Sequence, residues 1–120
     1  MGSITSISTS QLLASGAVSW TPSRAGLGEG RFCPQYITLH TSGSMASAQT
    51  FTVTLDDRTG STYDTLLYSE AISGGITDKL YTFPEGMRES GVEAGSYIKV
   101  TLTNTATPAT AAYLKLFYEV

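Results

Sequence analysis

Acidic side chains gather in the middle of the chain, where they could bind a cation or act as acid and base. Asp56 and Asp57 are adjacent, and Asp64 follows seven residues after Asp57. A calcium loop needs alternating oxygen ligands, a central glycine and a distal glutamate, and this spacing does not provide them. Asp side chains that precede Gly60 are typical of a turn, because they bond nearby N–H groups and glycine accepts positive φ. The cluster therefore predicts a turn.

The remaining reactive side chains stand alone in the sequence. His40 is the only histidine and Cys33 the only cysteine, whereas a triad or a zinc centre needs several such groups. One cysteine also excludes a disulfide framework. The glycine-rich residues 26–30 lack the lysine of a phosphate-binding loop. We therefore expect a protein that is not an enzyme and that uses no cofactor and no metal.

Composition narrows the class of partner. The 120 residues predict one domain, with seven basic residues against ten acidic ones and a net charge of -3. This balance argues against nucleic acid as a partner, which requires clustered Lys and Arg. No apolar run approaches the roughly 20 residues of a membrane-spanning helix, and the N-terminus lacks the pattern of a signal peptide. A soluble protein with no membrane partner is expected, with a hydroxyl-rich surface, since Ser and Thr together number 33.

Residues 95–120 show the two-residue period of half-buried strands most clearly. Ile98, Val100 and Leu102 alternate with polar residues, and the same alternation returns at Leu114 and Leu116. Residues 104–110 between the two runs have little to bury. We therefore predict an antiparallel hairpin with a seven-residue loop, which needs a second sheet for stability.

Further strands are predicted over residues 32–40, 49–55 and 77–83. Residues 61–72 are ambiguous, because Ser61 and Asp64 resemble a helix-capping box while the residues from Tyr63 onward alternate as in a strand; a strand is the preferred interpretation. Seven or eight short strands separated by Gly, Pro, Asp and Ser predict an all-β protein, a single antiparallel β-sandwich of jelly-roll-like form. An immunoglobulin-like sandwich is the alternative, although its paired cysteines are missing.

Residues 1–30 differ from the β-sandwich domain predicted for residues 31–120. They predict an extended N-terminal arm with one short strand near residues 17–20 and a glycine-rich loop, although an edge strand on the protein's own sheet fits equally well. The apolar residues of this arm are the candidates for contact with a partner: Ile4, Ile7, Leu12, Leu13 and Trp20. Trp20 also suits a core position. Deletion of residues 2–20 is expected to leave the sandwich folded.

The last strand carries aromatic residues on both of its faces. Tyr113 and Phe117 share the face opposite to Leu114 and Leu116, and a solvated face does not usually keep two large aromatics. Coverage by the protein's own second sheet or arm is one explanation. Contact with another subunit is the other, which makes Tyr113 and Phe117 candidates for self-association in a homo-oligomer.

Residues 49–120 resemble the small β-sandwich virion proteins of tailed bacteriophages, in particular capsid decoration or cement proteins. The similarity lies in the Thr-rich strand FTVTLDD, the YDT turn, the AGSYIKV corner and the aromatic-rich last strand. It implies a structural protein, often a trimer, that staples neighbouring subunits of the major capsid protein on the virion surface after a soluble stage in the host cytoplasm. Tail and fibre proteins share such sequences. The alternative is a carbohydrate- or receptor-binding module, which needs two or three coplanar exposed aromatics; the candidates are Tyr36, Tyr63, Tyr68, Tyr81 and Tyr97.

Overall fold

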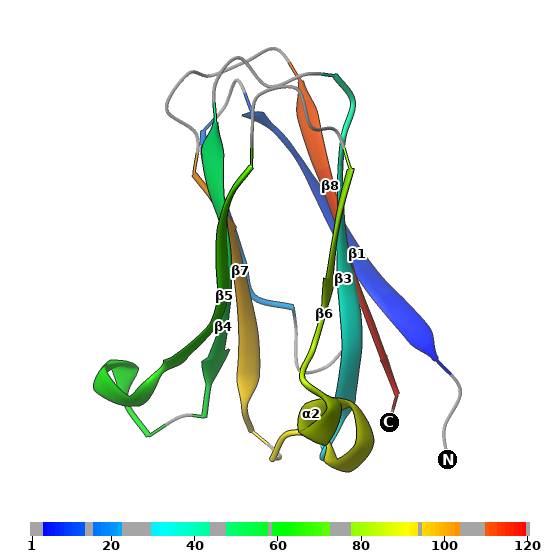
Figure 1. The fold of residues 1–120 in the computed structure, drawn as a ribbon, viewed down its shortest axis with the longest axis vertical. Coiled ribbons are helices and arrows are strands. Elements are labelled where there is room, and N and C mark those ends of the chain that lie inside the picture. Colours follow the sequence, from blue (N-terminus) through cyan, green and yellow to red (C-terminus); the bar gives the residue numbers. More distant parts are fainter. Residues whose placement is uncertain are drawn as a thin grey trace.

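The computed structural model describes residues 4–13, 16–22, 30–43, 48–57, 59–72, 78–93, 95–103 and 110–119. Strands dominate it (Figure 1). They are β1 (Thr5–Leu12), β2 (Val18–Trp20), β3 (Cys33–Thr41), β4 (Gln49–Asp56), β5 (Thr65–Ile72), β6 (Asp78–Thr82), β7 (Tyr97–Leu102) and β8 (Ala111–Glu119). The described residues also form the 3₁₀ helix η2 (Ser61–Tyr63) and the α-helix α2 (Glu85–Ser90).

The strands form two four-stranded sheets that pack face to face. Sheet A has the order β1-β8-β3-β6 and sheet B the order β2-β7-β4-β5, and every pairing is antiparallel. The partners are nested: β1 pairs with β8, β2 with β7, β3 with β6 and β4 with β5. Nested pairing of this kind is a long antiparallel ribbon wrapped into two layers, which is a jelly roll. The predicted fold class, an antiparallel β-sandwich, is confirmed.

The core lies between the two sheets and consists of every second residue of the strands. In β4, Phe51 and Val53 are buried, and in β8 the same holds for Leu114 and Leu116. Each such side chain contributes about 1.5–3 kcal/mol by leaving water, so the alternation itself fixes which face of each strand turns inward. The largest fully buried side chains are Phe32, Phe51, Phe83, Leu13, Ile37, Ile72, Ile98, Leu102, Leu114, Leu116 and Val53.

The predicted hairpin of the last two strands is wrong, although both strands exist. β7 lies in sheet B between β2 and β4, and β8 lies in sheet A between β1 and β3. The chain therefore crosses from one layer to the other between Leu102 and Ala111. A period of two residues reports that a strand has one buried face, but two strands facing each other across a core have the same pattern as two strands side by side. The loop residues 104–109 lie outside the described residues.

The ambiguous segment resolves into a short helix followed by a strand. η2 takes up Ser61–Tyr63, and β5 then pairs with β4 from Thr65 to Ile72. The preferred strand is thus confirmed. The preceding turn also follows the prediction, since the backbone N–H of Thr59 donates to Asp57 Oδ1 at 3.0 Å.

The described part of residues 1–30 belongs to the sandwich. β1 pairs with β8 at eight successive positions and β2 pairs with β7, so this segment adds one edge strand to each sheet. Residues 1–30 were expected to form either an extended arm or an edge strand, and the described part forms edge strands. The core buries Leu13 completely and Val18 almost completely, which holds this segment on the sandwich. This pairing and burial favour the opposite of the expectation that the sandwich stays folded without residues 2–20, and we predict that this deletion destabilises it.

Candidate functional site

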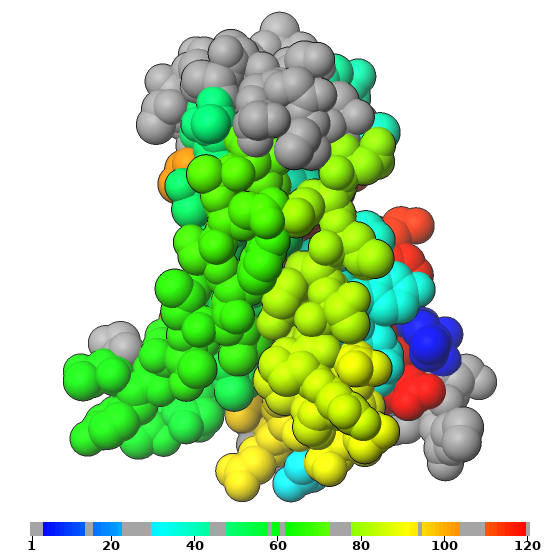
Figure 2. Space-filling model, in the orientation of Figure 1, coloured from blue at the N-terminus to red at the C-terminus, as the bar shows by residue number. Residues whose placement is uncertain are grey.

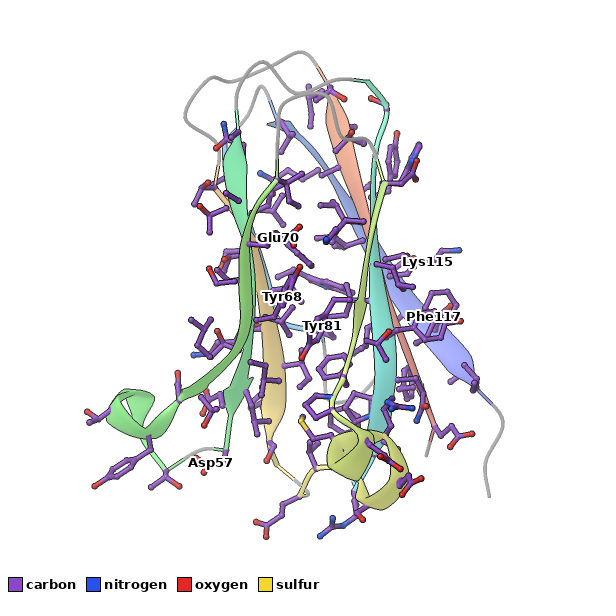
Figure 3. All side chains as sticks on the ribbon, viewed as in Figure 1. Asp57, Tyr68, Glu70, Tyr81, Lys115 and Phe117 are labelled. Atoms are coloured by element: carbon purple, nitrogen blue, oxygen red, sulfur yellow. The ribbon has the colours of Figure 1, made fainter. Side chains whose placement is uncertain are left out.

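The outer face of sheet A gathers large side chains that the core does not use. In β8 these are the residues between the buried ones, and the strand register sets residues of β3 and β6 beside them. We call this surface the aromatic face and define it by Tyr36, Thr38, His40, Leu80, Tyr113, Lys115 and Phe117. In Figure 3, Lys115 and Phe117 point away from sheet B. The face lines an open groove of about 790 Å³ together with parts of Leu39, Asp78 and Lys79.

One end of the aromatic face is a stacked ring pair. Tyr36 and Phe117 are directly opposite in the β3–β8 register, with ring centroids 4.5 Å apart and planes 24° from parallel. Both residues are half-buried. A cross-strand aromatic pair adds about 0.5–1.5 kcal/mol beyond the burial of its area. The stack thus gives this end of the face a fixed apolar surface.

The other end is a looser pair with a charge beside it. His40 is opposite Tyr113, their ring centroids are 6.1 Å apart, and Tyr113 is 46% exposed. His40 Nδ1 lies 2.8 Å from Asp78 Oδ1. Both side chains of this hydrogen-bonded pair are exposed, and such pairs contribute little to stability. The pair therefore orients the imidazole without holding it in place strongly.

The middle of the aromatic face is cationic and apolar. Lys115 and Leu80 flank Thr38, one on each neighbouring strand, and Leu80 is 58% exposed. A surface that joins aromatic rings, an aliphatic side chain and a single ammonium group has the composition of a protein contact surface, since aromatic residues are enriched in such contacts.

A second cluster connects the free edges of the two sheets. β5 and β6 meet along the front of the molecule in Figure 2. Tyr68 and Tyr81 stack there at 4.7 Å, the Tyr68 hydroxyl donates to Glu70 Oε1 at 2.6 Å, and Lys79 Nζ lies 2.5 Å from Glu70 Oε2. Figure 3 shows Tyr68, Glu70 and Tyr81 between the two strands.

The electrostatics of this cluster favour holding the edges together over catalysis. The hydrogen bond from Lys79, followed by that from Tyr68, lowers the pKa of Glu70. The pKa of Tyr68 is raised, mainly by desolvation and then by its bond to Glu70, and desolvation likewise raises the pKa of Tyr81. At neutral pH the carboxylate is thus ionised and both phenols keep their protons, so neither phenol is a base and Glu70 is no acid.

A third polar group lies on sheet B. Lys99 Nζ is 3.1 Å from Asp64 Oδ2 and 3.4 Å from Asp56 Oδ2, and the bond to Asp64 is the main cause of the raised pKa of Lys99. Asp64 Oδ1 is buried and has no hydrogen-bond partner within the described residues. The described residues contain no group of three His, Cys, Asp or Glu side chains placed to hold a metal ion.

The candidate partner-contact residues from the N-terminal segment do not form one surface. Ile4 and Leu12 are each 53% exposed, Ile7 and Trp20 are partly buried against the core, and Leu13 is completely buried. The self-association candidates Tyr113 and Phe117 do share one face. That Tyr36, His40 and Leu80 join them cannot be read from the sequence, because it requires the pairing of strands far apart in the chain.

The five tyrosines named for a carbohydrate site are spread over the molecule. Tyr36 is on the aromatic face, Tyr68 and Tyr81 stack on each other between the sheet edges, Tyr63 is exposed in η2, and Tyr97 begins β7. The structure therefore does not bring these five together.

No helix in the described part of the chain is long and apolar enough to cross a membrane. No protein-family model matches the sequence, and no curated protein matches it either.

Several solved structures resemble this chain in fold, and three of them are the following. A mitogen from Yersinia pseudotuberculosis is 13% identical, with 100% of this chain and 87% of that chain covered and a TM-score of 0.48. The acid-stable capsid of the Helicobacter pylori bacteriophage KHP30 is 15% identical, and the match covers 100% of this chain and 90% of that chain with a TM-score of 0.49. The glycosylation-associated Gap123 complex from Streptococcus agalactiae is 15% identical, and the match covers 92% of this chain and 36% of that chain with a TM-score of 0.36. These similarities are too weak to bear on function.

Proposed function

We propose that this chain is a structural virion protein of the capsid decoration type, which attaches through the aromatic face to subunits of a major capsid protein. The observation that carries the proposal is the pair of ring contacts left uncovered on the outside of sheet A, at Tyr36 with Phe117 and at His40 with Tyr113. The resemblance of residues 49–120 to decoration proteins supplies the kind of partner. The proposed location is the surface of the virion, and no catalytic role is proposed.

The mechanism is stabilisation of the assembled shell by binding. A protein that binds the lattice and not its free subunits stabilises the lattice by mass action. The aromatic face suits this role because rings fixed by stacking lose little side-chain entropy on binding, and such residues dominate interface energies. With one cation in its centre, Lys115, the contact depends mainly on apolar burial and only weakly on salt.

We assign the capsid contact to the aromatic face and not to the N-terminal segment. Leu13 is unavailable to a partner because the core buries it, and Trp20 and Ile7 pack against the same core. Ile4 and Leu12 remain exposed, but they lie at the β1 edge and not on the aromatic face.

The experiment compares two exposed leucines on opposite sheets. Leu80 in β6 is 58% exposed on the aromatic face, and Leu66 in β5 is 59% exposed on sheet B. Leu80→Asp and Leu66→Asp are introduced into the encoding phage, particles are purified on a density gradient, and the amount of this protein per particle is measured. We expect Leu80→Asp to lower occupancy at least tenfold and Leu66→Asp to leave it unchanged.

Two results would contradict the proposal in different ways. If the wild-type protein is absent from purified particles, the function is wrong. If the protein is present and both variants bind equally well, the function stands and the aromatic face is not the contact.

Carbohydrate binding is the second candidate, and one observation favours it. The two ring pairs are four residues apart on β8, which is about 13 Å, with Lys115 between them. Rings at that distance can stack on separate sugar units while an ammonium group binds a carboxylate of an acidic glycan. Binding on a glycan array that is lost in Lys115→Ala and in Tyr113→Ala would establish this function in place of capsid attachment.

A further inference from the structure

The four edge strands of the sandwich differ in how they discourage pairing with another chain. β6 carries Asp78 and Lys79, β5 carries Glu70 and a register shift in its pairing with β4, and β2 has only three residues. Charges, irregularities and short length are the usual protections of an edge. β1 has none of them: its eight residues TSISTSQL are uncharged, contain no proline and pair with β8 at eight successive positions.

The sequence around β1 is nearly symmetric about Ser8. Residues 4–12 read ITSISTSQL, so Ser6 and Ser10 are equidistant from Ser8, as are the two exposed residues Ile4 and Leu12. All five positions have even numbers, and Ser8 and Ser10 lie opposite Lys115 and Tyr113 of β8. These residues therefore face outward, on the same side of sheet A as the aromatic face.

We propose that two copies of this chain pair through their β1 strands, antiparallel and centred on Ser8, about a two-fold axis perpendicular to sheet A. In this register each Ile4 lies opposite Leu12 of the other copy. The same contact between exposed apolar residues therefore forms at both ends of the paired strands. Ser6 lies opposite Ser10, and Ser8 opposite Ser8. Main-chain groups on the outer side of β1 gain partners, and the two A sheets become one continuous sheet.

A second copy fits this edge better than an unrelated strand for two reasons. The symmetric spacing of Ile4 and Leu12 makes the strand complementary to itself, which a two-fold contact requires. The absence of charge means that pairing with itself brings no like charges together, whereas charged residues directly opposite each other destabilise a strand pair. In Figure 1 the N-terminal end of β1 diverges from the other strands at the lower right, and Ile4 next to it is 53% exposed.

This inference is independent of capsid attachment but has a consequence for it. The two aromatic faces of the dimer lie on the same side of the continuous sheet, so both can contact one surface. The first contact raises the effective concentration for the second, which strengthens attachment. A two-fold contact gives a dimer, whereas the resemblance to decoration proteins implies a trimer.

The test places one negative charge at the proposed axis. In Ser8→Glu the new carboxylate lies beside Lys115 of its own chain, which preserves the monomer, but opposite an identical carboxylate in the dimer. Thr82→Glu is the matched control, because it puts the same charge on the outer face of the other edge of sheet A. Light scattering at roughly 100 μM, a concentration at which even a weak dimer forms, reports the mass.

We expect twice the chain mass of 12.7 kDa for the wild type and for Thr82→Glu, and at least tenfold weaker association for Ser8→Glu with an unchanged melting temperature. In a second measurement, Ser8→Cys should form an intermolecular disulfide on mild oxidation and Thr82→Cys should not, with Cys33 present in both. A monomeric or trimeric wild type, a fully dimeric Ser8→Glu or equal cross-linking of the two cysteine variants would overturn the proposal.

Discussion

Two adjacent leucines at the end of β1 allow a direct test of whether the N-terminal segment belongs to the sandwich. Leu13 is completely buried in the core, while Leu12 is 53% exposed. The backbone N–H of Leu13 also donates to Thr110 O at 2.8 Å, which fixes this corner to the start of β8. The same substitution at the two positions should therefore have very different effects.

Leu13→Ala is expected to lower the free energy of unfolding by about 3 kcal/mol, because it removes a buried aliphatic side chain and leaves a cavity. For a domain of this size, that corresponds to a decrease in Tm of roughly 10–15 °C. Leu12→Ala should cost about 0.5 kcal/mol or less, the usual range for exposed positions. Both variants keep the length and charge of the chain, so each is the control for the other.

Urea unfolding followed by tryptophan fluorescence measures the effect. The midpoint for Leu13→Ala should fall while the slope m is unchanged, which indicates a loss of stability and not a change in the amount of surface exposed on unfolding. Measurement at low micromolar protein concentration limits any contribution from association. If the two variants unfold within 1 kcal/mol of each other, the segment is not part of the core and the assignment of β1 is wrong.

Three further predictions concern the backbone, the edge cluster and the N-terminal strands. Gly91→Ala should destabilise the fold by at least about 2 kcal/mol, since φ is +82° and a Cβ would lie 2.7 Å from Phe32 O. Gly86→Ala in α2 should be neutral or stabilising, and thermal unfolding of both variants measures the difference. Glu70→Gln should lower stability most at neutral pH, because a lowered carboxyl pKa stabilises the fold above about 4.5 and this contribution disappears as the pH falls through the folded pKa. The urea midpoints of the wild type and the variant should differ at pH 7 and approach each other as the pH is lowered. Deletion of residues 2–20 should abolish cooperative unfolding, as seen by circular dichroism.

The alternation of apolar residues predicts the sandwich and the strands after residue 30, but it leaves residues 5–12 between an arm and an edge strand and does not predict which strands pair. Phe51 and Val53 face the core as their spacing predicts. The position of β7 and β8 in opposite sheets could not be read from the same pattern, because it depends on pairing with strands that are distant in the sequence, as Thr5 is from its partner Tyr118. Local periodicity reports burial of one face, whereas topology is decided by the whole set of long-range contacts.

The candidate site was accessible from the sequence only in part. Tyr113 and Phe117 were identifiable, since aromatic residues on the outward positions of a strand are unusual on a solvated face. Tyr36 and Leu80 were not, because the register of β3 with β8 and β6 decides which residues lie beside them. The edge cluster of Glu70 and Lys79 was missed for the same reason, as it joins strands from different sheets.

The nested pairing has a consequence for the order in which the chain can fold during its synthesis. Among the described strands, the sole hydrogen-bonded neighbour of β1 is β8, and that of β2 is β7. The first strands to leave the ribosome must therefore wait for the last ones, while β4 and β5 can pair early. A nascent chain should stay sensitive to protease until β8 has left the ribosome, and then become resistant in a single step.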